Sequence, residues 1–187
     1  MSTTTQNRLE SRYAGISLTG YPHELTAWFV VALRFVMGGM MLFAGLGKFA
    51  FISGDGFNAA GYLANINPVS PVSGLYGAMA ASPMLIDVIN VVIPVTQVLI
   101  GLALIAGAFV RLAALGGALQ MLAFYLGGWD GQWLALFDST LIYAVVFLAI
   151  GAFAAGRILG LDRYIEQLTI GGEPLIDRYP KLRYVLG

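Results

Sequence analysis

Three polar side chains interrupt the most apolar stretches of the chain: Arg34, Gln97 and Gln120. At about 1.5 Å of helix rise per residue, they fall at similar depths from the same end of their stretches, with Arg34 roughly 13 Å deep. A guanidinium and two amides in a dry interior offer donors that suit quinone carbonyls or an anionic lipid headgroup. Alternatively, the three side chains satisfy one another as a polar lock between helices. No carboxylate lies at that depth, so Arg34 lacks an evident counter-ion, which favours a ligand, a lipid or a neighbouring subunit.

A second set of polar side chains lies near the opposite ends of the same stretches. Lys48 is positioned either to pair with Asp87 or Asp138, or to extend its ammonium group to the membrane interface. Asp138 and Tyr143 supply a carboxylate and a phenol, which can both exchange protons. We therefore expect this outer polar layer to be either a set of interfacial charges or the entrance of a proton or quinone path.

The scarcity of metal-binding and nucleophilic residues excludes several classes of chemistry. The chain has no cysteine and a single histidine, His23, at the start of the first apolar stretch. Thiolate metal sites, iron–sulfur clusters, disulfides, cysteine nucleophiles and bis-histidine haem ligation are excluded within this chain. We expect no metal and no covalently bound cofactor, which leaves a quinone or a lipid, and no catalytic residue can be assigned. The 10 basic and 10 acidic residues include no basic run, so nucleic acid is not an expected partner.

The composition indicates a membrane protein. Hydrophobic residues make up 58% of the chain and charged residues 11%, whereas soluble domains have roughly 45–50% and 25%. Spanning segments must satisfy their own backbone, and runs without alternation of period two are helices rather than barrel strands. We therefore predict an all-α membrane protein, an antiparallel bundle of four transmembrane helices. The predicted spans cover residues 25–47, 84–110, 112–129 and 133–155.

These spans predict a transmembrane domain at 25–159, preceded by segment 1–24 and followed by tail 160–187. Segment 1–24 is polar and lacks an apolar run, so we expect no cleavable signal peptide. The tail has apolar residues at helical spacing, which predicts either an amphipathic helix on the membrane surface or a docking surface for another subunit. Pro94 is expected to kink the second span.

The loop at 51–83, between the first two spans, is long but apolar. It predicts two short helices, one capped by Asp55 and the other beginning at Ser70 and Pro71. Such helices lie in the outer interface, cover the end of the bundle or bind a partner, and the sequence does not distinguish these alternatives.

The basic residues predict the orientation. Four spans place both termini and the second connection on one side of the membrane, and Lys48 on the other. The positive-inside rule therefore predicts a multi-pass protein of the cell membrane with cytoplasmic N- and C-termini. The basic residues on the predicted cytoplasmic side are Arg8, Arg12, Arg111, Arg157, Arg163, Arg178, Lys181 and Arg183.

Three motifs give the chain a resemblance to a known family. They are LRFVMGGMMLFAGLGKF in the first span, PVTQVLIGLALIAGAFVRLAA from the second span into the third, and GAFAAGRILGLDRYIE after the fourth. In their order and spacing, over about residues 27 to 168, they resemble the DoxX/DoxD family of small four-span membrane proteins. Many members carry a glutamate where this chain has Gln97, so a buried Arg–Glu pair would be Arg–Gln here. The family motif positions are Arg34, Gly38 or Gly39, Gly45, Lys48, Pro94, Gly101, Gly107, Arg111, Gly156, Arg157, Gly160, Leu161 and Asp162.

The resemblance implies quinone-linked redox chemistry. The first hypothesis is an accessory subunit of a respiratory or sulfur-oxidising complex, which docks other redox subunits in a hetero-oligomer and shapes a quinone or lipid site among membrane lipids. The alternative is a quinone-reducing subunit like the small subunit of thiosulfate:quinone oxidoreductase, with any covalent sulfur chemistry in a partner chain. A small transporter is the third reading, ranked last because no inverted repeat is evident.

Overall fold

The computed structural model describes residues 9–13, 16–20, 23–50, 54 and 56–187. The protein is mostly helical, and four of its helices are long and apolar enough to cross a membrane. This confirms the predicted class and the four candidate spans. The long helices are α1 (Thr26–Leu46), α5 (Pro83–Ala106), α6 (Val110–Gly128) and a fourth unit that joins the 3-10 helix η1 (Trp133–Phe137) to α7 (Ser139–Ala152).

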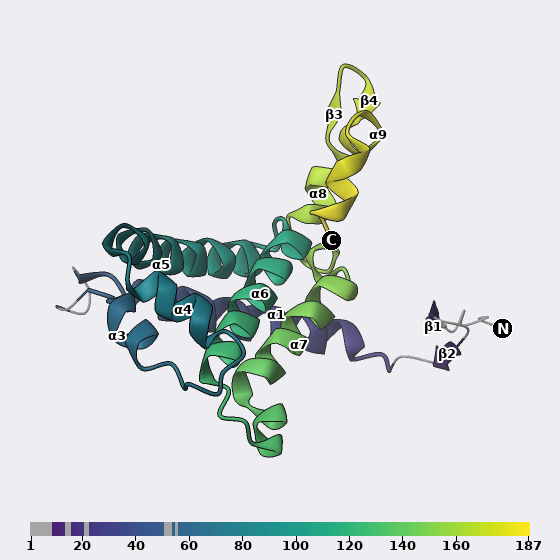
Figure 1. Ribbon diagram of the computed structural model, residues 1–187. Coiled ribbons are helices and arrows are strands. Elements are labelled where there is room, and N and C mark those ends of the chain that lie inside the picture. Colours follow the sequence, from purple (N-terminus) through teal and green to yellow (C-terminus); the bar gives the residue numbers. More distant parts are fainter. Residues whose placement is uncertain (1–8, 14–15, 21–22, 51–53, 55) are drawn as a thin grey trace.

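The helices pack mainly as two pairs, α1 with α5 and α6 with α7 (Figure 1). Gly101 of α5 lies directly against the backbone of α1. A Cβ at this position would come within 2.5 Å of the Leu42 nitrogen. Gly117 of α6 admits the ring of Phe147 from α7 in the same way, with a Cβ there only 2.8 Å from the ring. Small residues thus allow the close helix approach that stabilises proteins in lipid, where the hydrophobic effect between helices is absent.

The interior between the helices is apolar, and so is most of the outer surface. Met41, Leu104, Phe147 and Ile150 are buried in one core cluster. Large apolar side chains are also exposed along all four long helices, which is the expected distribution for helices that face lipid. They include Phe43 on α1, Val91 and Leu99 on α5, Leu119 on α6 and Leu148 on α7.

The first connection contains two short helices, α3 (Ala59–Ala64) and α4 (Ser73–Ala80). Asn58 caps α3, because its Oδ1 accepts a hydrogen bond from the Ala60 nitrogen at 2.9 Å. The proposed cap Asp55 lies outside the described residues. Asn90 of α5 accepts a 2.7 Å bond from the Ala59 nitrogen, which ties α3 to the second long helix.

Three hydroxyl groups of this connection satisfy the carbonyls at the end of α6. Tyr76 donates to the Ala123 oxygen at 2.9 Å, Ser70 to the Leu126 oxygen at 2.6 Å, and Tyr62 to the Phe124 oxygen at 3.4 Å. Leu126 is one of the last four residues of α6, whose carbonyls have no i+4 partner within the helix, so its bond stabilises the helix end; the bonds to Ala123 and Phe124 tie the connection to the last turns of α6. The connection therefore covers one end of α6.

Short elements occupy both ends of the chain. Two strands, β1 (Leu9–Tyr13) and β2 (Ile16–Gly20), pair antiparallel before α1. After α7, the chain forms the 3-10 helix η2 (Ala155–Arg157) and α8 (Asp162–Gln167), and then β3 (Thr169–Ile170), β4 (Glu173–Pro174), α9 (Leu175–Arg178) and the 3-10 helix η3 (Pro180–Tyr184). Figure 1 shows this tail standing away from the four long helices. It returns to the start of α6, where the Leu112 nitrogen donates to the Val185 oxygen at 3.3 Å.

Candidate functional site

Arg34 is completely buried where the chain leaves the fourth span. Its Nη1 donates to the Ala155 and Ile158 oxygens at 2.6 and 2.9 Å, and its Nη2 donates to the Leu159 oxygen at 2.9 Å. Leu159 has a φ of 50°, in the left-handed region that non-glycine residues rarely adopt. The guanidinium therefore holds a sharply folded backbone segment by its carbonyls; the Ala155 oxygen also accepts from the Ile158 nitrogen at 3.3 Å.

Asp162 is the matching carboxylate on the tail, and it too is completely buried. Its Oδ1 accepts from the Phe109 nitrogen at 2.6 Å, and its Oδ2 accepts from the Val110 and Gly187 nitrogens at 3.0 Å. The carboxylate thus satisfies free N–H groups at the start of α6, where negative charge is favourable. Asp162 also attracts Arg34 electrostatically. No carboxylate was predicted for Arg34 from the sequence, because Asp162 comes from the tail rather than from a span; Arg34 and Asp162 attract each other but do not form a direct ion pair.

Glycines allow the three segments around Arg34 to meet. A Cβ at Gly107, whose φ is 69°, would lie 2.5 Å from Gly160 Cα and 2.8 Å from Arg34 Nη1. Gly156 lies against the Gly187 oxygen and the Asp162 carboxylate. Five positions of the three sequence motifs therefore lie together in what we name the Arg34–Asp162 cluster: Arg34, Gly107, Gly156, Gly160 and Asp162.

The remaining motif positions have packing or tethering roles. Arg111 donates to the Arg183 oxygen at 2.6 Å and so holds the end of the tail. Arg157 makes a forked ion pair with Glu166, with a shortest distance of 2.7 Å. Gly45 packs against α5, where its Cβ would meet the Val98 nitrogen at 2.8 Å. Pro94 is buried in α5, which is one continuous helix from Pro83 to Ala106.

Gln97 and Gln120 lie away from Arg34. Arg34 contacts Gly107, whereas Gln97 lies ten positions earlier on α5, roughly 15 Å along the helix axis. The structure therefore does not bring the predicted inner layer together. The first turns of α1 extend past the end of α5, so a depth counted from the start of α1 places Arg34 too far into the bundle.

Gln120 lines a groove of about 730 Å³ between α5 and α6, which we name the α5–α6 groove. Its Nε2 donates to Thr96 Oγ1 at 3.3 Å, and Thr96 in turn donates to the Val92 oxygen at 2.6 Å. Gln120 Oε1 is shielded from solvent and has no hydrogen-bond partner within the described chain. The other walls are apolar and include Leu99, Ile100, Leu112 and Gly116. Gln97 Oε1 is also unpaired among the described residues, but Gln97 does not line this groove.

The outer polar layer is dispersed. Lys48 Nζ donates to the Ala44 oxygen at 2.9 Å and lies 5.7 Å from the centre of the Phe57 ring. Burial lowers the pKa of the Lys48 ammonium. Among the described residues the ion pairs join Arg157 to Glu166 and Arg183 to Asp177, so the structure does not pair Lys48 with Asp87 or Asp138.

Asp138 is the N-cap of α7. Its Oδ1 accepts from the Thr140 nitrogen at 2.7 Å and from the Thr140 hydroxyl. Tyr143 lies five positions further along, which places it on another face of α7, about 140° away. The carboxylate and the phenol expected to act together therefore point in different directions.

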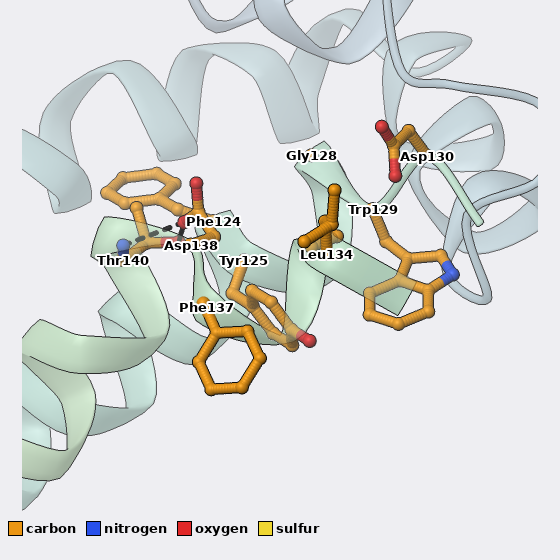
Figure 2. A pocket seen from close by; sticks show the side chains of 10 residues that line it. Phe124, Tyr125, Gly128, Trp129, Asp130, Leu134, Phe137, Asp138 and Thr140 are labelled. Carbon is orange, nitrogen blue, oxygen red and sulfur yellow. Dashed lines mark hydrogen bonds between the residues drawn. The ribbon is translucent and has the colours of Figure 1, made fainter. Parts of the chain in front are cut away.

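Asp138 also lines a second cavity, of about 320 Å³, where α6 ends and α7 begins. We name it the aromatic pocket. Figure 2 shows Asp138 beside Phe124 and Thr140 at one end, and Asp130 beyond Trp129 at the other. Tyr125, Leu134 and Phe137 lie between them. This site was not predicted from the sequence, because Asp130 and the aromatic residues fall on both sides of a predicted span boundary.

Comparisons with known proteins assign the chain to no family. No family model, no curated protein and no solved structure matches the chain. Within the described ranges, no group of three or more His, Asp or Glu residues could hold a metal ion.

Proposed function

We propose that this chain is a DoxX-like integral membrane accessory subunit of a quinone-linked respiratory or sulfur-oxidising complex, and that its α5–α6 groove holds a quinone or a lipid of similar polarity. The observation that carries the proposal is Gln120 in the wall of a largely apolar groove, because its Oε1 is shielded and has no hydrogen-bond partner among the described residues. A buried acceptor without a partner costs about 1–3 kcal/mol. A ligand that donates a hydroxyl to this oxygen would remove that cost.

A quinone in its reduced, quinol form fits this chemistry. Its ring hydroxyl would donate to Gln120 Oε1, while Thr96 holds the amide from the other side. Its isoprenoid chain would lie along the apolar walls, where Leu99, Leu112 and Leu119 are exposed on the outer surface of the helices. Gln120 would bind and orient the headgroup. The electron transfer itself would fall to a partner subunit.

The proposed assembly is an antiparallel four-helix bundle in the cell membrane with both termini in the cytoplasm. Arg111, Arg157, Arg163, Arg178, Lys181 and Arg183 lie at the same end of the helices as the Arg34–Asp162 cluster, or in the tail that follows it. Asp130 and Asp138 lie at the other end of α6 and α7. This distribution supports the proposed orientation.

The tail supports an accessory role. Tyr164, Tyr179 and Tyr184 are exposed on it, with exposed fractions of 66%, 52% and 81%. Exposed tyrosines beside basic residues are typical of contact surfaces, because tyrosine has a large apolar ring and a polar tip. The Arg34–Asp162 cluster fixes the start of the tail, and Arg111 fixes its end, so this surface is held on a rigid base.

The test of the groove is quinol binding to the purified chain in nanodiscs. Gln120→Leu removes the acceptor and should weaken binding of a short-chain quinol about tenfold, the effect of one lost hydrogen bond to a buried group. Gln97→Leu is the matched control, because it removes a buried unpaired amide outside the groove. Equal effects of the two variants on quinol binding would contradict the proposal that the quinol binds in the α5–α6 groove. Redox subunits that co-purify in a fixed ratio from native membranes would support the accessory role, and a chain that arrives alone would contradict it.

A further inference from the structure

We infer that the aromatic pocket binds an organic ammonium cation. Four of its lining residues are aromatic, Phe124, Tyr125, Trp129 and Phe137, and two are acidic. Aromatic rings attract cations through the negative potential of their faces, and nearby carboxylates add a direct attraction. The combination of aromatic walls and negative charge is the chemistry that recognises alkylated ammonium groups.

The two carboxylates are available to a ligand. Asp138 Oδ1 accepts from the Thr140 nitrogen, and Asp130 Oδ1 accepts from the Gln132 nitrogen at 2.9 Å. In the described chain, the hydrogen bonds of both carboxylates use Oδ1, and neither residue forms an ion pair. Each therefore retains its negative charge for an incoming cation.

The walls are held in place by local structure. Tyr125 is only 9% exposed, and its ring meets that of Trp129 edge to face with centres 5.7 Å apart. Asp138 is fixed as the N-cap of α7, and Asp130 lies in the tight link between α6 and η1. Figure 2 shows the two carboxylates at opposite ends of the pocket, with aromatic side chains between them.

This arrangement favours an organic cation over a metal ion. A bound Ca²⁺ needs six to eight oxygen ligands around one point, whereas the two carboxylates lie at opposite ends of an aromatic surface. The pocket, at about 320 Å³, is also far larger than a metal site. The residues that line it include no Lys or Arg to hold a phosphate. A free ammonium compound is thus favoured over the zwitterionic headgroup of a lipid.

The experiment is isothermal titration of choline into the full chain, purified in a maltoside detergent that carries no ammonium group. Choline is compared with its uncharged carbon isostere, in which a tert-butyl group replaces the trimethylammonium. We expect saturable choline binding and about tenfold weaker binding of the isostere. Phosphocholine should also bind more weakly than choline, because its phosphate meets two carboxylates.

The variants test whether the charge of the pocket residues, rather than the folding of the protein, determines choline binding. Asp138→Asn and Asp130→Asn should each weaken choline binding about three- to tenfold, since asparagine keeps the N-cap and the turn but removes the charge. Asp87→Asn is the matched control, an exposed acid on α5 outside the pocket, and should change binding less than twofold. Trp129→Leu should weaken binding by a similar factor to the pocket asparagines, because it removes an aromatic face.

Three results would overturn the inference. If choline does not saturate while circular dichroism shows intact helices, the pocket does not bind this class of cation. Equal affinity for choline and its isostere would make the interaction hydrophobic rather than cationic. Phosphocholine binding as tight as that of choline would contradict a free cation and identify the lipid headgroup as the ligand.

Discussion

Replacing Arg34 with alanine should destabilise the protein by about 3–5 kcal/mol, the cost typical of breaking a buried charged network by removing one member. Three charge-assisted hydrogen bonds to Ala155, Ile158 and Leu159 would be lost. The Ile158 and Leu159 carbonyls would lose the Arg34 donor where water has little access, whereas the Ala155 oxygen would keep its bond from the Ile158 nitrogen. Asp162 would also lose its nearby positive charge. The effect should therefore exceed that of any single surface change.

The assay is reversible unfolding in mixed micelles, followed by circular dichroism as a denaturing detergent is added. Arg163→Ala is the matched control, because Arg163 is an exposed arginine one residue from Asp162. A surface change of this kind usually alters stability by less than about 0.5 kcal/mol. Arg34→Lys keeps the charge but lacks the planar fork of donors, so an intermediate loss is expected.

A double-mutant cycle tests whether the cluster acts as a unit. Asp162→Asn alone should cost about 1–3 kcal/mol, because a neutral amide accepts less strongly from the Phe109 and Val110 nitrogens. The double variant with Arg34→Ala should lose clearly less stability than the sum of the two single losses, since the two side chains attract each other and hold the same segment. Equal, small effects of Arg34→Ala and Arg163→Ala would refute the reasoning about the cluster, and additive losses would refute its coupling.

Two further predictions concern the ends of the helices. Burial raises the pKa of the Tyr62 and Tyr76 phenols above the ordinary value of 10.0. The stability that these phenols contribute is therefore present below about pH 10 and is lost as the pH rises through the raised pKa. Tyr76→Phe should cost about 1 kcal/mol at neutral pH and should reduce this alkaline loss, as measured by unfolding at pH 7 and pH 11. Because the chain has no cysteine, a single introduced cysteine is the only residue that a maleimide can label on the protein. A membrane-impermeant maleimide should label Asp130→Cys in intact cells and Tyr184→Cys only after permeabilisation. The reverse pattern would contradict the proposed topology.

The sequence was sufficient to predict the four long helices, because an apolar run of this length can satisfy its backbone in lipid only as a helix. It was less informative about where helices begin. The fourth predicted span, 133–155, is divided by Asp138, which ends η1 and caps α7. Capping depends on the backbone angles of one residue, and hydropathy contains no information about these angles.

The polar residues show a different limit of sequence reasoning. Arg34 was correctly singled out by its cost in an apolar span, but its partners lie more than 100 positions away on a segment after the last span. Depth counting within the spans cannot find them. The available signal was the GRILGLD motif, in which two glycines accompany an acidic residue just beyond the fourth span. Glycines at such spacing allow close backbone approach, and here they admit Arg34 and Asp162 to the same cluster.

From the sequence, Arg34, Gln97 and Gln120 were expected to form together either a polar lock or a ligand site. In the structure these two roles fall at two different places. Arg34 directs its two terminal nitrogens at carbonyls and has a nearby carboxylate, and only its Nε has no hydrogen-bond partner among the described residues. Gln120 lines a groove with room for a ligand, and its Oε1 is unpaired among the described residues. Loss of Arg34 should therefore lower stability, whereas Gln120→Leu should weaken binding without lowering stability. Measuring both quantities for both variants would show whether the cluster and the groove are independent, as their separation along α5 requires.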